Sequence, residues 1–203
     1  MKLPALLQPR ILKTALKALF SPPFTTRYPA EPYTAQPSFR GRPRYQSEDC
    51  IGCGACAEVC PARCIDVTDD VSARPPRRRL VQHLDSCICC GQCERYCTTE
   101  KGIRLTNEFD FAGFKPADFE ESVEKELLLC EACGCVIAPV AQLRWVIRRL
   151  GPLAFANSTL MLVTLKDLAV VSDPVASDPD APHRGQHLTI QCPRCRRATA
   201  LAV

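Results

Sequence analysis

Apolar residues near the start of the chain recur at helical spacing. In residues 3–20, leucine, isoleucine, alanine and phenylalanine return every three or four positions, while the basic residues lie mainly between them. This pattern predicts a basic amphipathic helix, interrupted near Pro9, that forms a docking segment over residues 1–20. Such a helix suits either a membrane interface or the surface of a neighbouring protein, and the pattern does not separate the two.

Further along, short strand-like and helix-like stretches follow one another. Strands are expected at 64–70, 79–85 and 103–106, with a turn at 72–78 between the first two. Helices are expected at 115–129, which is acidic in its first part, and at 136–150, which Gly151 and Pro152 end. The apolar stretch 158–171 suits a helix or a strand. This mixture predicts an α+β fold.

The 18 prolines concentrate in three stretches, 22–43, 74–76 and 174–182. Proline fixes one backbone angle and removes a hydrogen-bond donor, so these stretches are expected to be extended linkers. We therefore predict an extended arm over residues 21–48 and a loop over 173–187.

Fifteen cysteines in 203 residues are more than an ordinary apolar core needs, and they are clustered. The chain shows no secretory signal peptide and no run of roughly 18 apolar residues. Clustered cysteines without an export signal favour metal binding in a reducing cytoplasm over disulfides. The net charge of +4 is mild. It suits nucleic acid, an anionic membrane or an acidic partner, and equally an ordinary soluble protein.

The stretch "CIGCGACAEVCP" places Cys50, Cys53, Cys56 and Cys60 in the spacing C-x2-C-x2-C-x3-C, followed by Pro61. This is the bacterial ferredoxin motif for [4Fe–4S] clusters. Three thiolates on a tight loop reach three irons of one cluster, and the small residues between them let backbone N–H groups approach the sulfurs. The fourth cysteine ligates the other cluster in two-cluster proteins.

A second run, in "DSCICCGQCERYCTTE", repeats this spacing with Cys87, Cys90, Cys93 and Cys97, although Thr98 replaces the proline. Reciprocal wiring follows from the two halves. We predict one [4Fe–4S] cluster on Cys50, Cys53, Cys56 and Cys97, and another on Cys87, Cys90, Cys93 and Cys60. Residues 49–110 would then form a two-cluster ferredoxin domain. Cys64 and Cys89 belong to neither ligand set. They are either small buried apolar side chains or have a ligand or redox role.

The C-terminal extension, residues 111–203, carries a third set of cysteines. Its two C-x2-C pairs are Cys130 with Cys133 and Cys192 with Cys195. Four thiolates suit one tetrahedral zinc or iron ion, although the pairs lie much further apart than the roughly 15–20 residues usual in such sites. Cys135 is a possible substitute ligand, and His183 and His187 are further candidates.

No nucleotide-binding glycine loop, nucleophile elbow or zinc-protease helix is evident, and no carboxylate pair stands out. The chain is therefore not expected to turn over a substrate by itself. About 50 residues precede the cysteine core and about 100 follow it, which is more than a diffusing ferredoxin needs. This indicates a fixed electron-transfer subunit of a larger assembly.

The stretch "YPAEP…FRGRPRYQSEDCIGCGACAEVCP", together with Cys87–Cys97, resembles the two-cluster subunit of respiratory complex I. It is still more similar to the ferredoxin-like subunit of group 4 membrane-bound [NiFe] hydrogenases, of the formate hydrogenlyase and hydrogenase-4 type. Two features favour the hydrogenase branch, "KPADFEESVEKELLLCEAC" after the core and the terminal "CPRC". The resemblance covers residues 1–135 well, and residues 136–203 only through the cysteine pairs and the general pattern.

The resemblance implies an electron relay at the cytoplasmic face of the inner membrane. Its partners would be the cluster-bearing small subunit, the [NiFe] large subunit, membrane-arm subunits and an electron-input iron–sulfur subunit. Electrons from formate, carbon monoxide or reduced ferredoxin would pass to protons and yield hydrogen. The eight cysteines of the two motifs are the ligands that carry over.

Three alternatives stay open. The first is the equivalent subunit of complex I or of a related quinone- or ferredoxin-linked complex. The others are the ferredoxin domain of a soluble redox enzyme and a zinc-ribbon protein that binds nucleic acid.

Overall fold

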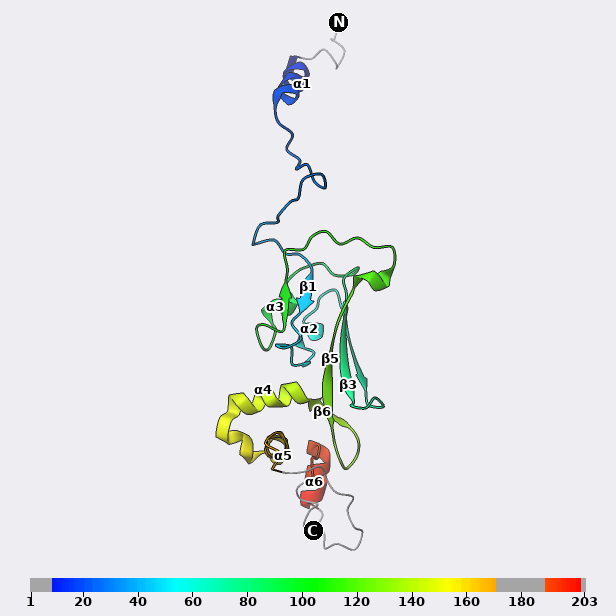
Figure 1. The fold of residues 1–203 in the computed structure, drawn as a ribbon, viewed down its shortest axis with the longest axis vertical. Helices are drawn as coiled ribbons and strands as arrows, with labels where there is room; N and C mark the ends of the chain where they lie inside the picture. The colour runs from blue at the N-terminus through cyan, green and yellow to red at the C-terminus, as the bar shows by residue number, and fades with distance from the viewer. Residues whose placement is uncertain (1–8, 171–188, 202–203) are drawn as a thin grey trace. The chain divides into compact units, whose positions relative to one another are not determined.

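The structure, a computed structural model, describes residues 9–170 and 189–201. Its elements are α1 (Pro9–Phe20), β1 (Pro43–Tyr45), α2 (Ala55–Glu58), β2 (Ile65–Asp70), β3 (Arg77–His83), α3 (Gln92–Arg95), β4 (Ile103–Leu105), η2 (Pro116–Phe119), β5 (Glu120–Leu129), β6 (Val136–Pro139), α4 (Val140–Leu150), η3 (Gly151–Ala156), α5 (Ser158–Asp167) and α6 (Pro193–Leu201). The two η elements are short 3₁₀ helices. The chain divides between Gln36 and Pro37 into two units (Figure 1).

The first unit contains α1, which matches the predicted amphipathic helix from Pro9 onward; residues 3–8 of that prediction lie outside the described part. Every residue of α1 is exposed. Its apolar side chains include Ile11, Leu12, Leu16 and Leu19, and it has no acidic residue in its first turn. None of the described helices is both long and apolar enough to cross a membrane.

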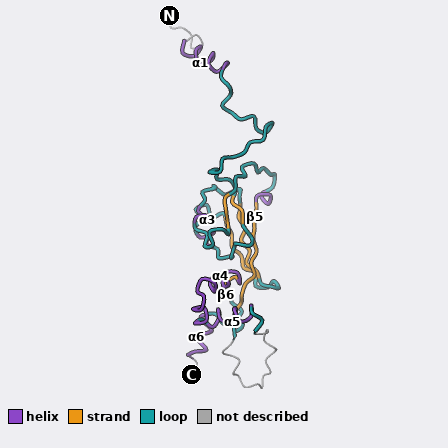
Figure 2. The backbone as a smooth tube through the Cα atoms, turned by 60° about the vertical axis from the view of Figure 1, so that its left-hand side comes forward, coloured by secondary structure: helices purple, strands orange, loops and turns teal. Residues whose placement is uncertain are grey.

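The second unit is built on an antiparallel sheet in the order β2-β3-β5-β6, shown in orange in Figure 2. The predicted strands at 64–70 and 79–85 are confirmed as the hairpin of β2 and β3, which pairs Ile65 with Gln82 and Asp70 with Arg77. The Asp70 carboxylate accepts hydrogen bonds from Ser72 and Ala73 at the start of the turn. Side chains alternate across a strand, so β3 turns a row of residues, including Leu80, inward.

A second, two-stranded sheet attaches the end of the predicted arm to the cysteine core. β1 pairs antiparallel with β4, the strand predicted at 103–106. Next to it, the Gly41 N–H donates to the Thr106 carbonyl oxygen at 2.8 Å. A side chain at Gly41 would place its Cβ 2.6 Å from that oxygen, so only glycine fits this approach. Residues 37–48 therefore belong to the same unit as the cysteine motifs.

The helix predicted over residues 115–129 is wrong. The structure has η2 at its start and then the ten-residue strand β5. The buried residues Val123 and Leu127 are four positions apart, a spacing that places them on one face of a helix and equally on one face of a strand. The apolar pattern alone could not separate these possibilities.

Pairing with β3 decides in favour of the strand. β3 begins with three arginines, and β5 brings acidic residues opposite the first and the third, with Arg77 facing Glu126 and Arg79 facing Glu124. The Arg77 guanidinium also contacts the Glu124 carboxylate diagonally at 3.2 Å. Such cross-strand pairs, together with burial of the apolar face, outweigh the helix propensity of the glutamates.

The C-terminal part packs helices at one end of the sheet (Figures 1 and 2). The helix predicted over residues 136–150 is a helix only from Val140, because residues 136–139 form β6 beside β5; it ends before Gly151, as predicted. Within the undecided stretch 158–171, Ser158–Asp167 form α5, which Asn157 caps by accepting hydrogen bonds from the N–H groups of Thr159 and Leu160. The predicted loop at 173–187 lies in the stretch that the structure does not describe.

Two apolar cores result. The first contains Leu80, Ile65, Ile103 and Val123 together with several motif cysteines, and the second contains Leu143, Ala154, Leu160 and Val163 under the C-terminal helices. Because motif cysteines form part of the first core, binding of the predicted clusters by these cysteines would be coupled to folding there.

We expect Leu80→Ala to lower the free energy of unfolding by about 2–5 kcal/mol, since Leu80 is 1 % exposed and its truncation leaves a cavity beside the cysteines. Anaerobic chemical denaturation measures this loss. The control is Val71→Ala, at a residue 52 % exposed, which should change stability by no more than about 0.5 kcal/mol. Equal effects of the two substitutions would contradict this description of the core.

Candidate iron–sulfur and metal centres

The first cysteine motif forms a tight loop that leads into α2. Gly52 and Gly54 both have positive φ, +68° and +79°, a conformation that glycine adopts without strain. Gly54 is the N-cap of α2, and α2 buries Cys56. The neighbouring sheet supports this loop, because the Arg78 guanidinium of β3 donates to the Gly52 carbonyl oxygen at 3.2 Å.

That arginine is itself held in place on β3. Arg78 makes two hydrogen bonds to the Asp69 carboxylate of β2, at 2.7 and 2.8 Å. These hydrogen bonds lower the pKa of Asp69. The pair fixes the guanidinium where it meets the first motif.

The second motif repeats this local structure. Gly91 is the N-cap of α3 with φ +79°, and α3 buries Cys93 as α2 buries Cys56. The same sequence pattern therefore folds twice into a loop and a one-turn helix, and α2 lies against α3.

The two motifs enclose two cavities. The first cavity is lined by Cys50, Cys53 and Cys56 of the first motif and by Cys97 of the second. The second cavity is lined by Cys87, Cys90 and Cys93 of the second motif and by Cys60 of the first. The fold thus brings together the two reciprocal sets that the spacing predicts.

The donor set of each cavity fits a [4Fe–4S] cluster. Four motif cysteines line each cavity, which is the number of thiolates that such a cluster takes from a protein. All eight of these cysteines are free thiols. Apolar residues, including Ile103 at the first cavity and Ile65 at the second, complete the lining and limit access of water.

The two surplus cysteines also border the second cavity. Cys64 is buried, with its Sγ 3.4 Å from the Cys60 Sγ, and burial raises the pKa of its thiol. Cys89 has a positive φ of +50°, and its backbone N–H donates to the Cys87 Sγ at 3.4 Å. Cys89 therefore contributes its backbone to a predicted ligand, a contact that the sequence spacing does not reveal.

Hydroxyl groups approach three of the four sulfurs of the first cavity. Tyr45 Oη lies 3.9 Å from the Cys56 Sγ, and Thr99 Oγ1 lies 3.4 Å from the Cys97 Sγ. Thr98, which replaces the usual proline, places its Oγ1 3.3 Å from the Cys53 Sγ. The departure from the motif thus adds a polar contact to a cysteine of the other motif.

Burial and hydrogen bonding have opposite effects on Cys97. Burial acts to raise the pKa of its thiol. Hydrogen bonds from the Thr99 hydroxyl and from the backbone N–H groups of Thr99, Gly102 and Ile103 outweigh burial, so the pKa is lowered.

Gln82 is a residue near a cavity that the sequence analysis missed. It lies on β3, is 1 % exposed, borders the second cavity and places its Nε2 3.7 Å from the Cys87 Sγ. A signal was present, because Gln82 is the polar member of an otherwise apolar alternating row, Leu80-x-Gln82-x-Leu84.

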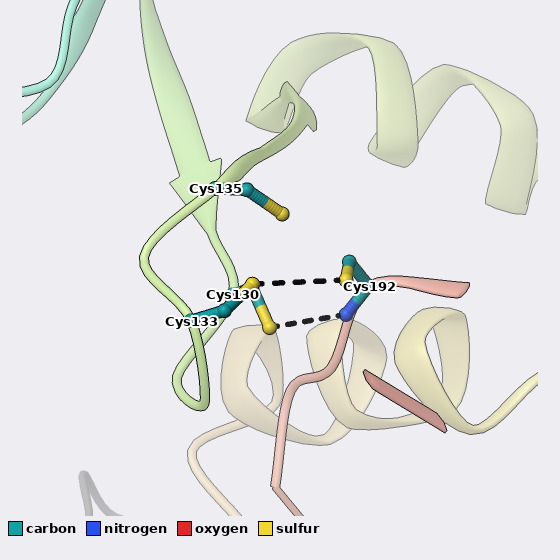
Figure 3. A group of neighbouring side chains, drawn as sticks. All are labelled: Cys130, Cys133, Cys135 and Cys192. Atoms are coloured by element: carbon teal, nitrogen blue, oxygen red, sulfur yellow. Dashed lines mark hydrogen bonds between the residues drawn. The ribbon is translucent and has the colours of Figure 1, made fainter. Parts of the chain in front are cut away.

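A third group of cysteines gathers between the end of β5 and the start of α6 (Figure 3). The Sγ atoms of Cys130, Cys133, Cys135 and Cys192 all lie within 4.8 Å of one another. Cys133 and Cys192 are 3.8 Å apart, which matches the sulfur–sulfur separation of about 3.8 Å expected for a tetrahedral ion with Zn–S bonds of about 2.3 Å. This third group is compact enough for a single ion.

Backbone hydrogen bonds organise the third group. The Cys192 N–H donates to the Cys130 Sγ at 3.2 Å, as the lower dashed line in Figure 3 shows. Gly134, with φ +70°, closes the turn by donating to the Cys130 carbonyl oxygen. At the start of α6, the Cys195 N–H donates to the Cys192 Sγ at 3.4 Å. This bond, together with hydrogen bonds from neighbouring cysteine thiols, lowers the pKa of Cys192 to about 6.

Three of the four predicted ligands, Cys130, Cys133 and Cys192, belong to this group. Cys135 is the fourth member, and Cys195 lies beside the group, with its N–H bonded to the Cys192 Sγ and its thiol in contact with Cys130, Cys133 and Cys192. His183 and His187, the other candidates, lie outside the described residues.

Comparison with known proteins agrees with the geometry of the two cavities. Residues 49–101 match the family model of the 4Fe-4S dicluster domain. NADH-quinone oxidoreductase subunit I 2 of Geobacter metallireducens is 35 % identical over 114 residues, which are 53 % of this chain and 86 % of that protein. Formate hydrogenlyase subunit 6 of Escherichia coli is 32 % identical over 111 residues, which are 54 % of this chain and 59 % of that protein.

Among solved structures, the membrane-bound sulfane sulfur reductase, described as an archaeal respiratory membrane complex, has a matching chain. The match has 27 % identity and covers 57 % of this chain and 60 % of that one, with a TM-score of 0.39, too low to compare the folds. The sequence matches and the dicluster domain are sufficient to assign the chain to a family. The chain belongs to the family of two-cluster iron–sulfur subunits that includes subunit I of NADH-quinone oxidoreductase and subunit 6 of formate hydrogenlyase.

Proposed function

We propose that this chain is the electron-transfer subunit of a membrane-bound [NiFe] hydrogenase complex and relays electrons through two [4Fe–4S] clusters. One observation supports the proposal of a two-cluster relay. Each cavity is lined by the first three cysteines of one motif and the fourth of the other. We assign Cys50, Cys53, Cys56 and Cys97 to the first cluster, and Cys87, Cys90, Cys93 and Cys60 to the second.

A bound cluster of this type accepts and releases single electrons, at a potential that its surroundings set. The residues of this chain hold and shield it. Cys56 and Cys93 are both 8 % exposed, so α2 and α3 keep part of each ligand set away from water. The hydroxyls of Tyr45 and Thr99 and the amide of Gln82 act as neighbours that polarise the ligand sulfurs.

The crossed ligand sets place the two centres next to each other. Cys53 and Cys60 lie on the same short segment but line different cavities, and α2 and α3 are in contact. Adjacent one-electron centres suit a fixed relay. The chain offers no separate substrate chemistry in this proposal, so catalysis belongs to partner subunits.

Two observations bear on the assembly. The resemblance to the formate hydrogenlyase branch and the C-terminal cysteine pairs support a hydrogenase, with the small and large hydrogenase subunits, membrane-arm subunits and an electron-input iron–sulfur subunit as partners. The greater coverage of the Geobacter subunit I, 86 % against 59 %, supports the alternative, a complex of the complex I type. Nucleic acid has no role in either.

We place the chain at the cytoplasmic face of the inner membrane as a peripheral subunit. The exposed apolar side chains of α1, flanked by Arg10, Lys13 and Lys17, suit the interface of an anionic membrane or the neighbouring membrane arm. The described residues include no spanning helix, which is compatible with such a position.

For the third group we propose one zinc or iron ion held by Cys130, Cys133, Cys135 and Cys192. A four-thiolate site has no open position, which is typical of structural metal ions. The ion would join the loop after β5 to the start of α6, about 60 residues later in the chain. Cys195, the ligand that the spacing predicts, would support Cys192 through its N–H group.

The ligand assignment predicts that replacing Cys89 and replacing Cys90, two adjacent cysteines, will have different effects on the iron content. The intact chain, purified without oxygen, should contain about eight irons in its two clusters, and Cys90→Ala should leave about four by removing a ligand of the second. Cys89→Ala should keep about eight, because Cys89 contributes its backbone N–H rather than its thiol. Iron analysis with electron paramagnetic resonance of the reduced chain measures both; the reverse result would show that the assignment is wrong.

Substitutions in the third group should show whether Cys135 or Cys195 is the fourth ligand of the ion. Elemental analysis should find about one zinc or iron beyond the cluster iron, and Cys135→Ala should lose it because a thiolate ligand is missing. Cys195→Ala should retain it. If Cys195→Ala loses the ion and Cys135→Ala keeps it, the ligands are the two C-x2-C pairs.

The assembly is tested by affinity purification of the full chain from its own cells. Hydrogenase large and small subunits are expected in the preparation, together with hydrogen evolution driven by formate, carbon monoxide or reduced ferredoxin. Co-purification of NADH-quinone oxidoreductase subunits instead would establish the alternative.

A further inference from the structure

Gln82 is buried where the sheet meets the second cavity. β3 and the residue after it turn Leu80, Gln82 and Leu84 inward, and these side chains are 1 %, 1 % and 5 % exposed. Both neighbours in this row are apolar. A glutamine at the centre of such a row loses its contact with water and adds no apolar packing that leucine or methionine would not supply.

The amide of Gln82 points toward one predicted ligand. Its Nε2 lies 3.7 Å from the Cys87 Sγ. A thiolate bound to iron accepts hydrogen bonds and donates none, so the NH₂ end of the amide, rather than its oxygen, faces the sulfur. The orientation of the side chain is therefore set by the chemistry of the ligand.

The other end of the amide is unsatisfied. Gln82 Oε1 is buried and finds no hydrogen-bond partner within the described part of the chain. An unpaired buried carbonyl oxygen destabilises the fold, and such groups call for an explanation such as a redox role. The contact with Cys87 supplies that explanation.

Cys87 receives a second donor from its own loop. The Cys89 N–H donates to the same sulfur at 3.4 Å. At the first cavity, the hydroxyl beside Cys53 belongs to Thr98, an exposed residue whose place water can take, whereas the Tyr45 hydroxyl beside Cys56 is buried. Water cannot replace the amide of Gln82, because the side chain is 1 % exposed.

We propose that Gln82 is a positioning residue that raises the reduction potential of the second cluster through its hydrogen bond to Cys87. The proposal rests on the cluster assignment above. When one electron enters the cluster, negative charge on its ligand sulfurs increases, and a donor to a sulfur stabilises the reduced form more than the oxidised form. Only the electron moves; no bond is formed or broken and no proton is transferred.

The test is Gln82→Met in the full chain with both clusters bound. Methionine has a similar length and no N–H donor. We expect the midpoint potential of one cluster to fall by about 59 mV, which corresponds to about a tenfold change in its reduction equilibrium constant, while the other cluster is unchanged. Redox titration followed by electron paramagnetic resonance measures both potentials.

The matched control is Leu80→Met, on the same strand and face and beside the first cavity. It introduces the same side chain at an equally buried position and should leave the second cluster's potential unchanged. Iron content is measured first, because about eight irons and two cluster signals in the unmodified chain establish the cluster assignment independently. Unchanged potentials in a fully loaded Gln82→Met chain would overturn the proposal.

A measurement on the unmodified chain covers the case in which Gln82→Met does not bind its clusters. With glutamine side chains labelled with ¹⁵N, pulsed electron paramagnetic resonance of the reduced second cluster should detect a nitrogen coupling. Gln92, which also borders the second cavity, is checked by Gln92→Met, which should retain the coupling. Absence of any coupling from labelled glutamine would also overturn the proposal.

Discussion

The convergence of eight cysteine sulfurs on two small cavities is the constraint on which the rest of this fold depends. Each motif must present three thiolates on one loop and send a fourth to the other cavity. Glycines at positive φ shape both loops, and α2 and α3 bury one cysteine each. The sheet supplies the wall behind them, so a small domain obtains its core from apolar residues and ligands together.

The same sheet connects the centres to the rest of the chain. β3 contributes Arg78 to the loop of the first motif and Gln82 to the second cavity. β5 pairs with β3 in the same sheet and leads to the third cysteine group, while β1 anchors the end of the N-terminal arm beside β4. The pair of β3 and β5 therefore supports all three groups of cysteines. This arrangement suits a subunit whose centres must keep fixed positions.

The third group illustrates why spacing is a weaker guide for a single ion than for a cluster. In the ferredoxin motifs, four cysteines lie within eleven residues, and short loops leave few alternative geometries. In the third group, 58 residues separate the two pairs, and five thiols compete for four positions. Cys135 enters the group because Gly134 turns the chain back toward Cys130.

The sequence by itself determined the hairpin of β2 and β3 and the amphipathic character of α1, and it predicted the reciprocal cysteine sets, because each follows from local spacing or periodicity. Only the tertiary structure decided that residues 120–129 form a strand, since Val123 and Leu127 suit both periods and the arginines of β3 select the strand. It likewise decided the place of Gln82, whose contact with Cys87 requires β3 to lie against the second motif. Local patterns specify which side chains can bind, and long-range pairing specifies which neighbours surround them.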